Sequence, residues 1–269
     1  MPELPEVEFA RRSLARWMKG KTIRRAVATR TRVLSPLSPT AFAKAVRGAK
    51  VLDVERRGKN LFLSLACGLG LRMHLGMTGK ILLRKKGAEA PRFSRVAFEM
   101  SSGGIVHFCD MRLFGAVSAG PAEQLRERAF AGLGPDPLVD GLTAQLLRTR
   151  LAKTKRPLKI ALMDQALIAG LGNIHAAEAL WRARVSPFAR ADKLTHLQAA
   201  RLAAGIHAGI RFALDDSAGD DEIVYVEEGG DNPFHVYDRG GDPCRRCRTP
   251  IKKKTQGGRT TYWCPRCQA

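Results

Sequence analysis

The chain begins Met1-Pro2-Glu3-Leu4-Pro5-Glu6-Val7-Glu8, and both the fold and the chemistry that we expect start from this stretch. Removal of the initiator methionine would leave Pro2 as the amino terminus, a secondary amine. An α-amino group has a pKa of roughly 7.7–8.0, against about 10.4 for lysine, so part of it is uncharged near neutral pH. The uncharged amine can attack an aldehyde carbon and form an iminium, with Glu3 and Glu6 available for proton transfer. A simpler interpretation is that the prolines only begin a helix.

The residues that follow have the spacing of an amphipathic helix. Apolar side chains recur at helical intervals from Leu4 to Met18, arginines lie among the polar positions, and Gly20 marks the end. A terminal amine needs such an anchor, because a frayed terminus could not be aimed at a substrate.

Length, composition and charge limit the class of protein. The 269 residues exceed one typical domain, and a hydrophobic content of 45% is ample for two cores. No long apolar run or secretory signal is present, so we expect no membrane span and a cytoplasmic, nucleoid-associated protein. The 46 Lys and Arg against 25 Asp and Glu give a net charge of +21. This charge favours a polyanionic partner such as nucleic acid, although it also fits a ribosomal or chaperone-like protein.

The first half of the chain has the pattern of many short strands separated by turns. One helix, Pro39–Val46, interrupts them. This spacing predicts a β-sandwich or barrel. The expected strands are Thr22–Thr29, Lys50–Arg56, Leu61–Leu65, Gly70–Leu75, Lys80–Arg84, Arg95–Met100, Ile105–Asp110 and Ala116–Ser118.

After Pro135 the hydrophobic period becomes helical. A turn, Gly170-Leu171-Gly172-Asn173, opens the third expected helix and could hold a phosphate, because glycines admit close approach and helix amino termini attract anions. An ordinary turn capped by Asn173 explains the same residues, so both interpretations stay open. The expected helices are Thr143–Ala152, Pro157–Asp164, Asn173–Trp181 and Thr195–Leu214.

The cysteines predict a metal site. Cys244 and Cys247 form one Cys-x2-Cys pair and Cys264 and Cys267 another, with 16 residues between the pairs. This spacing is typical of a ribbon in which four thiolates hold one structural zinc ion. Disulfides are the weaker explanation in a reducing compartment. The remaining two cysteines, Cys67 and Cys109, are expected to be buried free thiols.

Charge changes sign near the carboxyl end. Residues 215–231 contain eight acidic residues and no basic one, which predicts a solvated loop. From Arg239 onward nine Lys and Arg stand against one acid, so we place the ribbon on the polyanion-binding side. The expected hairpin tip, Gln256-Gly257-Gly258-Arg259, would present Arg259 either as a phosphate clamp or as a plain surface charge.

An amino-terminal Pro2-Glu3, a Gly170-x-Gly172-Asn173 turn and a terminal four-cysteine ribbon together resemble the formamidopyrimidine-DNA glycosylase/endonuclease VIII family of base-excision repair enzymes. The resemblance runs end to end, and Leu4 favours the formamidopyrimidine branch. It implies an α+β multidomain fold with an amino-terminal β-sandwich and capping helix, a helical helix–two-turn–helix domain and a zinc ribbon. The implied bounds are 1–134 for the catalytic domain, 135–214 for the helical domain, 215–238 for an acidic loop or linker and 239–269 for the ribbon.

The same resemblance implies a bifunctional DNA glycosylase and AP lyase. It would remove oxidised bases, with purines expected, through a Schiff base at the amino-terminal proline followed by β,δ-elimination. The expected partner is damaged double-stranded DNA in a basic cleft between the domains, the protein is expected to be a monomer, and zinc is its one, structural cofactor. Two alternatives stay open: the scaffold acts on oxidised pyrimidines or other lesions, or it is a non-catalytic zinc-ribbon lesion-binding protein.

Roles for individual residues follow from the resemblance alone. Pro2 is implied as the nucleophile at C1′, Glu3 as acid/base at the sugar and Glu6 as a carboxylate supporting the same centre. Lys59 matches the lysine tied to β-elimination and phosphate contact. Three side chains would fill the gap left by the everted nucleotide: Met77, Arg112 and Phe114. Apolar side chains replace the lost base stacking there, and an arginine hydrogen-bonds the orphaned base. The phosphate contacts implied or expected are His74, Asn173, Arg259, Lys155 and Arg95. Arg92 is the alternative to Arg95.

Two departures from the family pattern bear on specificity. Leu113 stands where the usual pattern has a second arginine. The stretch 215–231 does not read like the segment that leads into the loop over the everted purine in 8-oxoguanine enzymes. These departures leave the damaged base and the role of the acidic loop open, while the expected sugar chemistry is unaffected.

Overall fold

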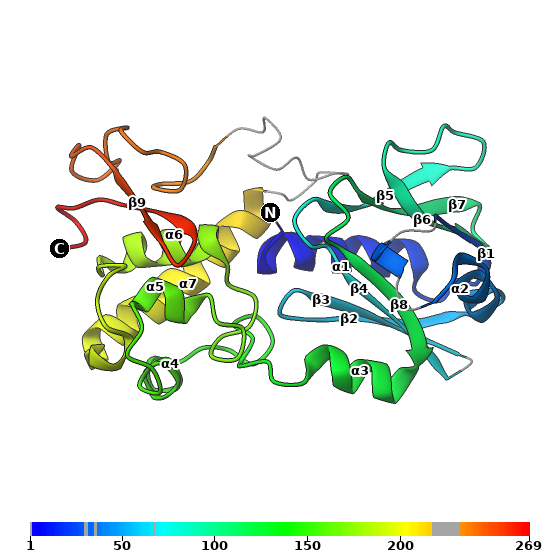
Figure 1. Cartoon of the computed structure of the whole chain (residues 1–269), viewed down its shortest axis with the longest axis horizontal. Coiled ribbons are helices and arrows are strands. Elements are labelled where there is room, and N and C mark those ends of the chain that lie inside the picture. The colour runs from blue at the N-terminus through cyan, green and yellow to red at the C-terminus, as the bar shows by residue number, and fades with distance from the viewer. Residues whose placement is uncertain (1, 30–31, 35–36, 67, 217–231) are drawn as a thin grey trace. The chain divides into compact units, whose positions relative to one another are not determined.

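The computed structural model describes residues 2–29, 32–34, 37–66, 68–216 and 232–269, which form two compact units (Figure 1). Residues 2–131 belong to the first unit, and residues 132–216 with 232–269 belong to the second. Among these residues no helix combines the length and apolar character needed to cross a membrane. The thiol of Cys67 and residues 217–231 of the predicted acidic loop 215–231 lie outside the described residues; the loop prediction is wrong for Asp215 and Asp216, which end helix α7 (His196–Asp216).

The first unit is a sandwich of two four-stranded antiparallel sheets, with strand orders β1-β6-β7-β5 and β2-β3-β4-β8. Inward-facing side chains such as Leu63, Phe98 and Phe108 are fully buried in one core. The β-sandwich prediction is therefore confirmed. The strands are β1 (Ile23–Ala28), β2 (Val51–Arg57), β3 (Asn60–Leu65), β4 (Leu69–His74), β5 (Gly79–Lys85), β6 (Ser94–Met100), β7 (Gly104–Asp110) and β8 (Ala116–Pro121).

Two helices cover the open sides of the sandwich. Helix α1 (Leu4–Met18) packs on β2 and β5, which are edge strands of opposite sheets, and α2 (Pro39–Val46) packs on the other two edge strands, β1 and β8. The apolar stripe of α1 is buried, with Val7 and Leu14 at 0% exposure, and each such side chain contributes about 1.5–3 kcal/mol. The predicted capping helix is confirmed, and its apolar face lies in the core.

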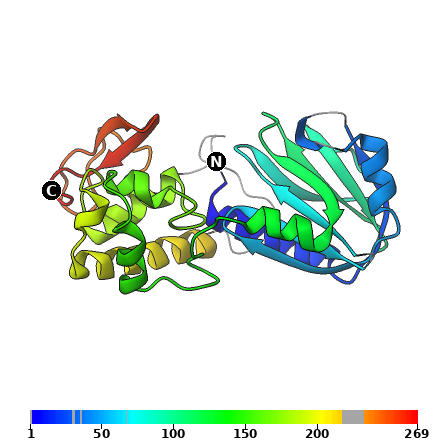
Figure 2. The same cartoon turned by 60° about the horizontal axis from the view of Figure 1, so that its bottom comes forward.

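The sequence analysis missed helix α3 (Ala122–Phe130), which packs on the outer face of β3, β4 and β8 (Figure 2). Only Ala129 in this helix is buried, and Phe130 makes an edge-on contact with Phe62. A helix that buries so little has no clear apolar stripe, which is why the hydrophobic period gave no signal.

The second unit contains four α-helices among its described residues, and all four were predicted with ends shifted by a few residues. Helix α6 packs on α7, α7 on α4, and α5 on both α4 and α6. Their buried positions include Leu151, Leu162, Leu180 and Leu202. The helices are α4 (Ala144–Leu151), α5 (Leu158–Leu162), α6 (Asn173–Ala183) and α7 (His196–Asp216). Short 3-10 turns lie at η1 (Arg32–Leu34) in the first unit and η2 (Ala191–Lys193) in the second.

The ribbon hairpin completes the second unit. Strand β9 (Lys252–Gln256) pairs with β10 (Arg259–Trp263), and β10 packs on α6. Gly257 and Gly258 have φ angles of +56° and +73°, as a two-residue type I′ turn requires. The predicted hairpin tip is confirmed.

Candidate active site and nucleic-acid interface

Pro2 and Glu3, which directly precede α1, are both buried. Glu3, at 0% exposure, is the N-cap of α1. The Glu3 side chain accepts the backbone N–H of Glu6, while Glu6 Oε2 accepts the backbone N–H of Glu3 at 2.8 Å. This reciprocal capping box satisfies two N–H groups that the helix itself leaves unpaired. Both carboxylates predicted beside Pro2 are thereby held at the start of α1.

Lys59 lies at the tip of the β2–β3 hairpin. Arg57 pairs with Asn60, so Gly58 and Lys59 form a two-residue turn, and Gly58 has a φ of +56°. Glycine at the first central position suits this kind of turn, because it adopts positive φ without strain. The turn therefore presents the lysine at a fixed point.

A buried guanidinium connects this turn to α1. Arg56, whose side chain is 1% exposed, donates from Nε to Glu8 Oε2 at 3.1 Å and from Nη1 to the Gly58 carbonyl at 2.9 Å. Burial alone would raise the pKa of the Glu8 carboxyl, but the hydrogen bonds and charges of Arg11 and Arg56 hold that pKa below its usual value. The helix that follows Pro2 and the turn that carries Lys59 are thus held together through one guanidinium.

His74 lies beside this turn, because Asn60 of β3 pairs with His74 of β4. The backbone N–H of Gly76 donates to His74 Nδ1 at 3.1 Å, so the neutral ring carries its proton on Nε2. Burial, followed by the charges of Arg72 and Lys59, lowers the pKa of His74 to about 4. The side chain is therefore a neutral hydrogen-bond donor at physiological pH, which suits contact with a phosphate.

The lowered pKa of His74 predicts a pH-dependent stability. Between pH 6.5 and about 4 the unfolded chain binds a proton at this residue and the folded chain does not. Stability is therefore lost as the pH falls through that window, by up to about 3 kcal/mol. Urea unfolding of wild type and of His74→Gln from pH 7.5 to 4.5 measures this loss. As the pH falls, the free energy of unfolding should decrease less in the variant than in the wild type. A difference in this free energy that stays constant with pH would refute the lowered pKa of His74.

The residues expected to form the wedge come from two turns that lie against each other. Gly76, at φ +62°, approaches the Phe114 backbone so closely that a Cβ there would be 2.4 Å from the Phe114 carbonyl carbon. The Asp110 carboxylate accepts the hydroxyl of Thr78 at 2.6 Å and the backbone N–H of Gly115 at 2.7 Å. Next to these contacts, Met77 is 36% and Phe114 48% exposed, and the Arg112 guanidinium lies 5.0 Å from the Phe114 ring centroid. The structure therefore brings Met77, Arg112 and Phe114 together.

The two weaker expected DNA contacts are placed differently. Arg95 is half-buried, donates from Nε to the Asp110 carbonyl at 2.9 Å and lies 5.7 Å from the Phe93 ring, so it also supports the end of β7. Lys155 is exposed in the turn between α4 and α5, where its neighbour Arg156 pairs with Asp164. Neither placement tests the expected role.

The second unit holds a separate polar cluster at the start of α6. The N-cap is Gly172 and no side chain caps the helix, so Asn173 does not serve as an ordinary cap. Instead, Asn173 Oδ1 accepts Lys159 Nζ at 2.5 Å, and Asn173 Nδ2 donates to the Thr260 carbonyl at 3.2 Å. The glycine turn is thereby joined to the ribbon hairpin, directly beside the exposed Arg259.

Lys159 is a residue of this cluster that the sequence analysis did not single out. Its side chain is fully buried, and Nζ also donates to Thr261 Oγ1 at 2.8 Å. A charged lysine is almost never buried unless it is paired or hydrogen-bonded. The available signal was a lysine inside the apolar run Leu158–Leu162. Its partners Thr260 and Thr261 lie about a hundred residues further along the chain.

The four predicted zinc ligands meet at one point. The sulfurs of Cys244, Cys247, Cys264 and Cys267 all lie within 4.8 Å of one another, and those of Cys247 and Cys264 are 3.4 Å apart. Tetrahedral coordination at Zn–S distances of about 2.3 Å requires sulfurs about 3.8 Å apart. Backbone N–H groups of Arg246 and Cys267 donate to the sulfurs of Cys244 and Cys264, as outer hydrogen bonds to metal-bound thiolates do. The donor set fits one structural zinc ion.

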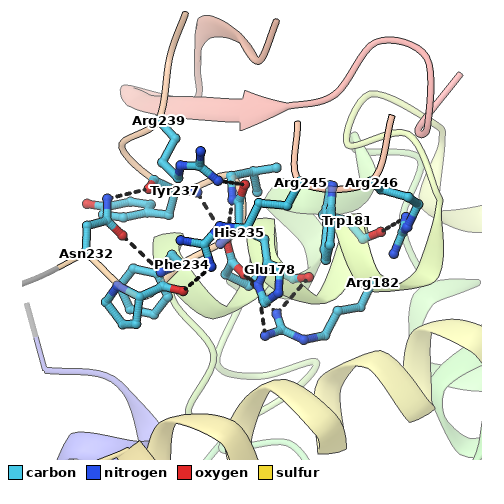
Figure 3. A network of polar contacts seen from close by, with 12 residues as sticks. Glu178, Trp181, Arg182, Asn232, Phe234, His235, Tyr237, Arg239, Arg245 and Arg246 are labelled. Carbon is cyan, nitrogen blue, oxygen red and sulfur yellow. Dashed lines mark hydrogen bonds and ion pairs between the residues drawn. The ribbon is translucent and has the colours of Figure 1, made fainter. Parts of the chain in front are cut away.

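A buried carboxylate fixes the chain that leads into the ribbon (Figure 3). Glu178 Oε1 accepts the backbone N–H groups of His235, Val236 and Tyr237 at 3.0, 2.8 and 3.1 Å, and Oε2 pairs with Arg182 at 2.9 Å. Burial would raise the pKa of Glu178, but the His235 hydrogen bond, the Arg182 charge and the backbone N–H groups lower it to about 2. The carboxylate is therefore charged throughout the physiological range.

Replacing Glu178 is expected to destabilise the second unit strongly. Glu178→Gln removes a charge whose side chain is 1% exposed and leaves the Arg182 guanidinium without its partner, which costs about 3–5 kcal/mol. Thermal unfolding measures the loss, with Asp215→Asn, an exposed acid on α7, as the control. A melting temperature equal to that of the control would contradict the anchoring role.

Comparison with family models accounts for most of the chain. Residues 1–117 match the formamidopyrimidine-DNA glycosylase N-terminal domain, residues 133–222 match the formamidopyrimidine-DNA glycosylase H2TH domain, and residues 241–269 match the zinc finger found in FPG and IleRS. These matches define the class of helix–two-turn–helix proteins with a zinc ribbon.

Relatives and solved structures extend over the full length. The formamidopyrimidine-DNA glycosylase of Heliobacterium modesticaldum is 39% identical, and the match covers 100% of each chain. That of Salinispora arenicola is 38% identical, and the match covers 100% of this chain and 96% of its own. The MutM (Fpg) protein of Thermus thermophilus is 34% identical with a TM-score of 0.84, covering 99% of this chain and 98% of its own. Lactococcus lactis Fpg in complex with abasic-site DNA is 30% identical with a TM-score of 0.88, covering 99% of each chain. The chain belongs to the formamidopyrimidine-DNA glycosylase family, as its motifs predicted.

Proposed function

We propose that Pro2 is the nucleophile of this enzyme, a DNA glycosylase and AP lyase of base-excision repair. The observation that carries the proposal is the buried Pro2, next to which Glu3 and Glu6 form a capping box and Arg56 connects α1 to the Lys59 turn. A free terminus on a solvated loop could not hold an amine against a sugar carbon.

The chemistry follows from these groups. The neutral amine of Pro2, freed by loss of Met1, attacks C1′ as the bond to the damaged base breaks and the base leaves with the bonding electrons. The Glu3 carboxylate takes the proton that the amine loses on forming the C1′–N bond and gives it to the ring oxygen, so the C1′–O4′ bond breaks, the sugar opens and an iminium forms. Loss of a C2′ proton then expels the 3′ phosphate, and a second elimination expels the 5′ phosphate. Covalent catalysis of this kind divides one difficult step into easier ones.

Further residues would position the DNA. Lys59 and the neutral Nε2–H of His74 would contact phosphates near the sugar, and Asn173 and Arg259 would do so from the second unit, with Arg95 and Lys155 as additional contacts. Phosphate contacts position the strand without reading its sequence. Met77 and Phe114 would fill the space left by the everted nucleotide, while Arg112 would hydrogen-bond the orphaned base. Zinc would hold the ribbon in shape and supply no chemistry at the sugar.

The substrate class proposed is an oxidised purine in duplex DNA. A MutM structure with carbocyclic 8-oxo-G containing DNA is 30% identical with a TM-score of 0.88, and covers 99% of each chain. The divergent 215–231 segment favours a second candidate, an oxidised pyrimidine, on the same scaffold. Single-turnover excision from duplexes that carry 8-oxoguanine, formamidopyrimidine, an oxidised pyrimidine or an abasic site separates the two. Preference for the oxidised pyrimidine would overturn the purine assignment.

The finer organisation is also part of the proposal. We place the domain bounds at 1–134, 135–214, 215–238 and 239–269, and the protein acts as a monomer on duplex DNA in the cytoplasm, at the nucleoid. A net charge of +21 supports DNA binding that weakens steeply with added salt, because phosphate contacts release counterions.

A further inference from the structure

One arginine outside every assigned set contacts the turn that carries the expected wedge. Arg32, in η1, donates from Nε to the Leu113 carbonyl at 2.6 Å and from Nη2 to the Arg112 carbonyl at 3.0 Å. Its guanidinium carbon also lies 4.8 Å from the Phe114 ring centroid. One planar cation thus contacts three consecutive residues that are some eighty positions away in the sequence.

The backbone of this turn explains why such a contact matters. Leu113 has a φ of +59°, in the left-handed region that few residues other than glycine adopt, and its side chain packs against the sandwich core. That inward rotation leaves Arg112 and Phe114 on the exposed side. A strained turn persists only where surrounding contacts hold it, and Arg32 supplies two hydrogen bonds to it from a charged donor.

The other end of the turn is already fixed. The backbone N–H of Arg112 donates to Thr78 Oγ1 at 3.1 Å and to Asp110 Oδ1 at 3.2 Å. The N–H side is therefore held by Asp110 and Thr78, and the carbonyl side is held by Arg32. Together the contacts fix the backbone on both sides of the turn from which the side chains of Arg112 and Phe114 extend.

We infer that Arg32 is a positioning residue for the wedge, which holds Arg112 and Phe114 in the conformation that enters the DNA. This inference rests on the proposed function, because it concerns how that function reaches its substrate. A turn ordered beforehand avoids the ordering cost at the moment of binding. Arginine suits the task better than lysine, because its planar guanidinium donates two hydrogen bonds in a fixed geometry to neighbouring carbonyls.

The test compares Arg32→Gln and Arg32→Lys with wild type and with Arg24→Gln, which removes the same charge from an exposed position in β1. Single-turnover excision from a lesion duplex is expected to fall about tenfold in Arg32→Gln and less in Arg32→Lys, while Arg24→Gln stays near wild type. The fluorescence of 2-aminopurine next to the lesion rises when the wedge unstacks this base. This fluorescence should be lowest with Arg32→Gln, higher with Arg32→Lys and highest with wild type and Arg24→Gln.

Borohydride trapping on a single-stranded abasic oligonucleotide needs no wedge, so Arg32→Gln should trap as wild type does. Excision by Arg32→Gln equal to that of Arg24→Gln would overturn the inference, whereas an equal loss of single-strand trapping would indicate general misfolding of Arg32→Gln. The conservative variant Arg32→Lys then decides. If its melting temperature and its rate of excision both equal those of wild type, the positioning role is wrong. Absence of trapping by wild type would instead contradict the proposed function, while the 2-aminopurine signal still reports the wedge.

Discussion

Pro2→Gln is expected to lose the covalent step and, with it, base excision and strand cleavage by on the order of a hundredfold or more. A large second residue keeps Met1 in place, so the terminal amine is displaced by one residue from the position that the capping box of Glu3 and Glu6 defines. DNA binding should change little, because the proposed phosphate contacts lie elsewhere.

The measurement is cleavage of an abasic-site duplex together with borohydride trapping, with the amino terminus of each protein determined by mass spectrometry. Pro39→Gln is the matched control, because Pro39 is a proline at the start of another helix of the same unit, α2. Cleavage by Pro2→Gln at the level of this control would show that another group is the nucleophile.

Cys264→Ser is expected to lose zinc and DNA binding together. Removal of one of four thiolates leaves an incomplete site, and structural zinc binding and ribbon folding are the same equilibrium. An unfolded ribbon also removes the partners that Lys159 and Asn173 find at Thr260 and Thr261. We expect DNA affinity to fall by on the order of a hundredfold, because contacts from the ribbon and from the start of α6 are lost together.

Zinc content and DNA affinity measured on the same preparation check this expectation. Cys109→Ala is the control, since Cys109 is a buried cysteine of the sandwich and outside the metal cluster. Normal DNA affinity in a zinc-free Cys264→Ser protein would show that the ribbon, including Arg259, does not grip DNA.

Much of the fold was predictable because many of its elements have a recognisable local sequence pattern. The stripe from Leu4 to Met18, the alternating strands and the two cysteine pairs are each read within a short window of sequence, and the structure confirms them. Helix α3 was not predictable in this way, because it lies on the outer face of a sheet and only its residue Ala129 is buried. Its helical state depends on packing that a local pattern does not show.

The residues of the site also divide into those that a local sequence pattern identifies and those that it does not. Motif residues such as Pro2, Asn173 and Arg259 could be chosen from the sequence, but the charged groups that hold them could not. Arg56 connects Glu8 to Gly58, and Lys159 connects Asn173 to a hairpin about a hundred residues away. A charge on an apolar run shows only that a partner must exist. The fold alone reveals which partner it is.

The central claim is that the amino-terminal proline forms the Schiff base. Wild-type protein, shown by mass spectrometry to lack Met1, is incubated with an abasic-site duplex and sodium borohydride, and the cross-linked peptide is then sequenced. The account predicts one covalent adduct, located on Pro2. No adduct, or an adduct on a lysine such as Lys59, would contradict it.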